Sequence, residues 1–285
     1  MGVNSLVKVL ALAAPLTLMG SSALAGPVAS GFDTTTLPRN DDSSTGAISP
    51  GFSMNFFGST YDHFYVNNNG NITFNSALRA YTPFGVGAGY SGQPIIAPFF
   101  ADVDTEASAS GLVAYGTGTY AGRDAFGVTY PRVGYYDLHG DPLNTFQVIL
   151  TDRSDAGAGD FDIYFNYDQI LWESGDDSGG FHGLGGTSAA AGFSNGTGAA
   201  GTYFQFAGSL VSGALVDGGP DALVSHTNDA VTGQYLFQVR NGSVVVPPAA
   251  GSVPEPASWA LMLTGFLGAG AALRSRRRRT ASALA

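Results

Sequence analysis

Residues 62–74 read DHFYVNNNGNITF, and this stretch indicates the fold more clearly than any other part of the chain. Two short runs of strand-forming residues flank an Asn-Asn-Asn-Gly segment, which is the pattern of two strands joined by a turn. Asn and Gly tolerate the positive φ that both central positions of a tight hairpin turn require. The stretch therefore predicts a β-hairpin.

Similar short runs, bounded by Gly, Asn and Asp, recur along the chain. The best pair of long strands is 145–151 (TFQVILT) and 161–167 (FDIYFNY), which an Asp- and Gly-rich turn connects. Further strands are predicted at residues 94–101, 111–116, 124–130 and 233–240, the last of these closing the domain. Helical periodicity is hard to find between the two ends of the chain. We therefore predict an all-β fold, an antiparallel β-sandwich, with helices only at the two ends.

The N-terminal segment, residues 1–25, has the features of a signal peptide. Lys8 precedes an apolar run, and Ala23 and Ala25 form the small-x-small pattern that signal peptidase accepts. We predict a signal helix that is removed by cleavage after Ala25. The rest of the chain is then exported.

The C-terminal segment has three parts in a fixed order, after a Pro-biased linker at 246–253. Pro254, Glu255 and Pro256 come first, followed by an apolar run at 257–273 whose 17 residues are at the short limit for a transmembrane helix. A basic cluster follows, which the positive-inside rule places in the cytoplasm: Arg276, Arg277, Arg278 and Arg279. We predict a single C-terminal transmembrane helix.

Residues 254–280 resemble the PEP-CTERM sorting signal of Gram-negative exported proteins. The resemblance implies recognition by exosortase, a membrane protease, and transient anchoring in the inner membrane. The protein would then reach the cell surface or be secreted.

The charge of the exported part limits its partners. Six of the 12 basic residues and 21 of the 22 acidic residues lie at 26–253, where the net charge is therefore −15. Nucleic acid and anionic lipid are therefore poor partners, because binding their phosphates needs a basic surface. Divalent cations, cationic surfaces and neutral sugars remain. The chain has no cysteine, so a hydrophobic core rather than disulfides must hold the fold.

Several segments together resemble the nidogen-like (NIDO) extracellular domain. They follow one another in the order of that domain, at residues 64–70, 95–104, 144–150, 165–172, 191–193 and 235–239. The resemblance spans about 50–240, and we assign residues 26–245 to the domain. It implies an extracellular interaction module of the kind found in matrix and adhesion proteins, and it implies no reaction.

Asp102, Asp104 and Glu106 are the candidate metal ligands. On an extended segment these alternating carboxylates would share one side, where three like charges favour a hard cation. Calcium is the available extracellular ion, and no other cofactor is expected.

We therefore predict a non-enzymatic, exported protein that acts in cell-surface or matrix interaction, with an extracellular polysaccharide or a matrix protein as partner, in biofilm or exopolysaccharide. Two alternatives stay open. A secreted carbohydrate-active hydrolase would need a buried carboxylate pair in a deep cleft. A calcium-dependent adhesin would be stabilised by calcium.

Overall fold

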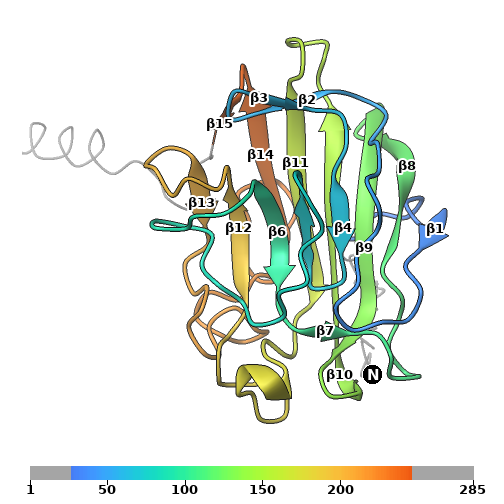
Figure 1. Cartoon of the computed structure of the whole chain (residues 1–285), viewed down its shortest axis with the longest axis vertical. Coiled ribbons are helices and arrows are strands. Elements are labelled where there is room, and N and C mark those ends of the chain that lie inside the picture. The colour runs from blue at the N-terminus through green and yellow to red at the C-terminus, as the bar shows by residue number, and fades with distance from the viewer. Residues whose placement is uncertain (1–26, 246–285) are drawn as a thin grey trace, which may run out of the picture.

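The structure is a computed structural model that describes residues 27–245, and these residues form two antiparallel sheets packed face to face (Figure 1). The larger sheet has eight strands in the order β1-β8-β9-β10-β11-β14-β15, with β7 paired to β9. Its strands are β1 (Thr35–Thr36), β7 (Val103–Asp104), β8 (Ala114–Tyr120), β9 (Arg123–Tyr135), β10 (His139–Asp152), β11 (Phe161–Gln169), β14 (Gln234–Arg240) and β15 (Ser243–Val245).

The smaller sheet has five strands in the order β13-β12-β6-β5-β4. These are β4 (Tyr65–Asn67), β5 (Asn71–Thr73), β6 (Ile95–Phe100), β12 (Ala190–Ser194) and β13 (Tyr203–Gln205). A separate hairpin, β2 (Met54–Phe56) and β3 (Ser59–Tyr61), lies across one end of the sandwich (Figure 1). The helical content of residues 27–245 is one 3₁₀ turn, η1 (Asp176–Ser178). The predicted all-β antiparallel sandwich is confirmed.

Strand alternation places the core between the two sheets. On β11, Phe161, Ile163 and Phe165 face the smaller sheet and are fully buried in the main core. Asn166, which follows Phe165, lies on the opposite face. Its side-chain nitrogen donates to the side-chain oxygen of Gln147 on β10, and its side-chain oxygen accepts from the side-chain nitrogen of Gln234 on β14. Because side chains alternate with a period of two, β10, β11 and β14 give one face to the core, and Gln147, Asn166 and Gln234 lie on the other.

The predicted hairpin is present, but its turn differs from the expected one. Asn67 pairs with Asn71, so the turn holds three residues, and Gly70 is the member with positive φ (72°). A three-residue turn with glycine in the left-handed region is the next most common hairpin connection after the two-residue type. The expectation of positive φ at both central positions was wrong.

Strand boundaries also differ from the prediction. β9 and β10 extend over 13 and 14 residues, beyond the predicted 124–130 and 145–151, because each is continued by pairing near their shared turn. β14 is not the closing strand, since β15 adds a further hairpin to the sheet edge.

A long loop, residues 74–94, covers the outer face of the smaller sheet. Its Val86 is fully buried with Ile95, Ala97 and Phe100 of β6, in a cluster separate from the main core. Both faces of β6 are thus covered, which explains why its whole sequence is apolar.

Three sequence predictions lie outside the described residues. These are the signal helix, the linker and the C-terminal transmembrane helix. Within residues 27–245, no helix has the length and apolar character needed to cross a membrane.

The turn at Gly70 should tolerate no side chain. A Cβ there would lie 1.7 Å from the carbonyl oxygen of Phe99, whereas at Gly122, with a similar φ of 75°, it would meet nothing within 4 Å. We expect Gly122→Ala to cost about 1–2 kcal/mol for backbone strain, and Gly70→Ala to cost more than about 4 kcal/mol or prevent folding. Urea unfolding monitored by tryptophan fluorescence compares the two. Equal losses would show that the close approach to Phe99 is unimportant.

Candidate functional site

The Asn-Asn-Asn segment of the hairpin is buried rather than exposed. Asn67, Asn68 and Asn69 are each at most 1% exposed. Asn67 uses its amide within the sheet, since its nitrogen donates to the side-chain oxygens of Asn71 (2.7 Å) and Thr73 (2.9 Å). Its oxygen accepts from the backbone N–H of Leu78 (2.9 Å) and so holds the start of the 74–94 loop.

Asn68 and Asn69 connect two segments that are distant in sequence. The Asn68 nitrogen donates to the backbone oxygens of Asp41 and Val103. The Asn69 nitrogen donates to Oδ1 of Asp42 (2.7 Å), and its oxygen accepts from the N–H of Val103 (2.9 Å). The two asparagines therefore fix the 41–42 segment beside strand β7.

This arrangement produces an acidic cluster. Asp41, Asp42 and Asp102 each place one carboxylate oxygen within 4.8 Å of the others. They line a small pocket of about 120 Å³, which Tyr81, Tyr136 and Asp177 complete. Asp102 is 1% exposed, and Asp41 and Asp42 are partly buried.

The electrostatics of this cluster are unfavourable for three ionised carboxylates. Burial, followed by the negative charges of its neighbours, raises the pKa of Asp41 to about 7. The same causes raise the pKa of Asp102 to about 7. Burial also raises the pKa of Asp42, although its hydrogen bond from Asn69 and the charge of Arg79 act in the opposite direction. Within residues 27–245, no salt bridge pairs these carboxylates with a cation that would favour the ionised form.

The structure does not bring the predicted metal ligands together as expected. Of Asp102, Asp104 and Glu106, only Asp102 joins the cluster. Asp104 is buried and accepts from the N–H of Glu106 (2.6 Å) and of Leu138 (2.8 Å), and Glu106 is exposed. The alternation ends because β7 is only two residues long.

Asp41 and Asp42 were not identified from the sequence. They lie in a polar segment with no metal-binding spacing, about 60 residues before Asp102. Their only signal was the Asp-Asp pair itself, which is common in solvated loops.

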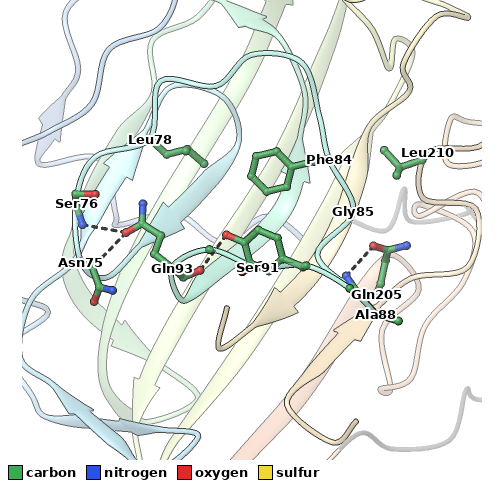
Figure 2. Close-up of a pocket in the computed structure, with 14 residues that line it drawn as sticks. Asn75, Ser76, Leu78, Phe84, Gly85, Ala88, Ser91, Gln93, Gln205 and Leu210 are labelled. Atoms are coloured by element: carbon green, nitrogen blue, oxygen red, sulfur yellow. Dashed lines mark hydrogen bonds between the residues drawn. The ribbon is translucent and has the colours of Figure 1, made fainter. Parts of the chain in front are cut away.

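A second, much larger pocket lies at the 74–94 loop (Figure 2). Its volume is about 1060 Å³, and its lining carries no charged side chain. The lining residues are Asn75, Ser76, Leu78, Phe84, Gly85, Gly87, Ala88, Gly89, Tyr90, Ser91, Gly92, Gln93, Gln205 and Leu210.

Two aromatic rings form the rigid part of this pocket. Phe84 and Tyr90 stack with centroids 5.3 Å apart and an interplanar angle of 12°. Phe84 also packs edge-on against the buried Phe100 (4.8 Å, 76°), and the Tyr90 hydroxyl donates to the backbone oxygen of Gln93 (3.0 Å). The rings are thus held from both sides.

Two glutamines flank these rings (Figure 2). The side-chain oxygen of Gln93 accepts from the N–H groups of Asn75 (3.1 Å) and Ser76 (2.9 Å), and that of Gln205 accepts from Gly87 (3.1 Å). With their oxygens engaged, both side chains keep amide N–H donors for a ligand, since within residues 27–245 neither nitrogen has a hydrogen-bond partner. The pocket offers aromatic faces and neutral donors.

Comparison with protein families assigns this sandwich. The model of the nidogen-like domain matches residues 62–241, which include the whole five-stranded sheet, all strands of the larger sheet except β1 and β15, and the 74–94 loop. The chain belongs to the nidogen-like domain family. The resemblance of residues 50–240 to the nidogen-like domain is confirmed.

Individual relatives of this nidogen-like chain agree. Alpha-tectorin of Gallus gallus is 32% identical over 232 residues, and alpha-tectorin of Homo sapiens is 32% identical over 227 residues, each covering 72% of this chain. Nidogen of Drosophila melanogaster is 30% identical over 253 residues, covering 79% of this chain. The match spans 10% of each alpha-tectorin and 17% of the nidogen. No solved structure matches the chain.

The predicted sorting residues cannot be placed in this geometry. Ala23 and Ala25 precede the described residues, and Pro254, Glu255, Pro256 and Arg276 to Arg279 follow them.

Asn68 should contribute measurably to stability. Asn68→Ala would leave buried backbone oxygens of Asp41 and Val103 without their donor, so we expect a loss of about 1–3 kcal/mol in the free energy of unfolding. Asn75→Ala, at an exposed position, should change it by less than about 0.5 kcal/mol. Chemical denaturation measures both. If the Asn68 variant were as stable as the Asn75 variant, the connecting role of Asn68 would be rejected.

Proposed function

We propose that the chain is an exported, non-enzymatic interaction protein of the cell surface or extracellular matrix, and that its nidogen-like domain binds a neutral polysaccharide. The uncharged, aromatic pocket at the 74–94 loop is the observation that carries this proposal. Membership of a family that includes stretches of alpha-tectorin and nidogen supports an interaction role.

The chemistry of the pocket favours neutral sugars. Aromatic faces pack against the apolar faces of sugar rings, and side-chain amides donate to hydroxyl groups. The volume of about 1060 Å³ is at the upper end of the range of ordinary ligand pockets, about 300–1,000 Å³, and suits several linked sugars. The net charge of −10 disfavours anionic polymers.

The hydrolase alternative receives less support from the same geometry. A glycosidase needs two carboxyl groups flanking the scissile bond. The large pocket is lined by none, and the pocket that contains carboxylates has a volume of only about 120 Å³. This is well below the typical size of a ligand site.

Removal of the Tyr90 ring tests the binding proposal. We expect Tyr90→Ala to weaken binding to the best neutral polysaccharide at least about 10-fold, because aromatic side chains in pockets dominate binding energies. Affinity electrophoresis with glucan, mannan, galactan and the anionic polymer alginate gives the measurement.

Phe181→Ala is the matched control, since Phe181 is 77% exposed and does not line the pocket. Its binding should equal that of the wild-type chain. Preference for alginate, or equal binding by the Tyr90 and Phe181 variants, would contradict the proposal.

Sorting through the two ends of the chain is the second part of the proposal. Signal peptidase would cleave after Ala25, and an exosortase-type protease would act near Pro254, Glu255 and Pro256 in a Gram-negative envelope. The domain would then reach the surface or the medium, in exopolysaccharide or biofilm. The order of the Pro-Glu-Pro, apolar and arginine segments supports this route.

Intact mass of the mature protein tests both cleavages at once. We expect an N-terminus at Gly26 and loss of Arg276 to Arg279 from most molecules, with the protein in the surface or medium fraction. Substitution of Glu255→Ala should leave the N-terminus unchanged and increase the fraction that retains the arginines. Retention of the arginines in most wild-type molecules would count against processing.

A further inference from the structure

We propose that Asp41, Asp42 and Asp102 form a calcium-binding site that connects the N-terminal segment of the domain to strand β7. The site would be separate from the polysaccharide pocket, since the two share no lining residue. The geometry of the three carboxylates and the unpaired oxygens of Asp41 and Asp102 support such a site.

Two carboxylate oxygens in the cluster are buried without a partner. They are Oδ2 of Asp102 and Oδ1 of Asp41, neither of which has a hydrogen bond within residues 27–245. Leaving a buried acceptor unpaired costs about 1–3 kcal/mol, and more when the group is charged. The Asp102 side chain, at 1% exposure, therefore presents a buried oxygen that a bound cation would satisfy.

Another buried carboxylate in the same domain shows how the protein neutralises charge where no ion is needed. The Asp162 side chain is 3% exposed and forms ion pairs with Arg153 (2.8 Å) and Arg240 (2.6 Å). Within the described residues, none of the salt bridges includes Asp41, Asp42 or Asp102. The charge of Arg79 lowers the pKa of Asp42, but within residues 27–245 Arg79 forms no ion pair with the cluster. The cluster thus lacks the compensation that Asp162 has.

The donor set fits calcium. Calcium takes oxygen ligands at about 2.3–2.6 Å, so two ligands on one ion are at most about 4.6–5.2 Å apart. One oxygen from each of the three carboxylates, all within 4.8 Å of one another, meets this limit. The pocket of about 120 Å³ holds one ion and a few waters, and Asp177 at its rim adds negative charge. Calcium's tolerance of irregular, partly hydrated coordination suits it better than magnesium.

The ligands are held in place before any ion binds. Asn69 fixes Oδ1 of Asp42. The backbone of Gly175 packs against Asp102 so closely that a Cβ there would lie 2.3 Å from Oδ2. A preorganised site has less ordering entropy to lose on binding.

Thermal unfolding of the full-length chain provides the test, after EDTA treatment and with 10 mM CaCl2 or 10 mM MgCl2. Extracellular calcium modules bind with Kd of about 10⁻⁴–10⁻³ M, so we expect calcium to raise Tm by about 3–10 °C. Asp102→Asn should lose this shift and be at least as stable as wild type in EDTA, because it removes like-charge repulsion. Asp124→Asn is the matched control, since Asp124 is exposed at the far end of β9 from β7 and should keep the full shift.

Terbium luminescence gives a second measurement that does not depend on stability. Tyr81 and Tyr136 line the pocket and would sensitise a bound Tb³⁺, which calcium should displace. Asp42→Asn, at a less buried position, keeps the test valid if Asp102→Asn fails to fold. An unchanged Tm with calcium, an equal shift with magnesium, or a full calcium shift in the Asp102 or Asp42 variant would overturn the proposal.

Discussion

The buried amides of Asn67, Asn68 and Asn69 are the constraint on which both candidate sites depend. A buried amide must have its hydrogen bonds made, because each unpaired group costs about 1–3 kcal/mol. Each of these three side chains donates hydrogen bonds to neighbouring segments, although the side-chain oxygen of Asn68 has no partner within residues 27–245. The bonded segments are held at defined positions. Residues 41–42 are fixed on one side and the 74–94 loop on the other.

This constraint is combined with a close backbone contact. Gly70 completes the turn and lies against the carbonyl of Phe99, which leaves no space for a side chain. The turn of the hairpin therefore packs directly against β6, and its asparagine side chains form hydrogen bonds with residues 41–42 and with the 74–94 loop. The two sheets supply a rigid frame, and the functional chemistry lies in the loops attached to it, as is usual for binding sites on sandwiches. The positions of the large uncharged pocket and of the acidic cluster both depend on this one turn.

Strand-level features were predictable because they depend on local patterns. The alternation at 145–151 and 161–167 reflects an apolar face toward the main core and a more polar face on the other side, and β10 and β11 pair as expected. The Asn-Gly pair predicted the hairpin correctly. The length of its turn depends on the packing of Gly70 against Phe99 of β6, and this long-range contact leaves no local pattern in the sequence. Of the three predicted metal ligands, Asp102 lies in the acidic cluster. Asp104 and Glu106 do not join it, because the strand ends at Asp104, whose side-chain oxygens accept from backbone N–H groups.

The sequence by itself determined the all-β class and the positions of the long strands along the chain, since these follow from periodicity. The resemblance of several segments to the nidogen-like domain indicated the family. Only the tertiary structure decided that Asp41 and Asp42 meet Asp102, and that Phe84, Tyr90 and Gln205 share one pocket. These groups come from segments about 60 to 120 residues apart. Their proximity results from sheet pairing and from buried asparagine hydrogen bonds, and such long-range contacts leave no spacing in the sequence.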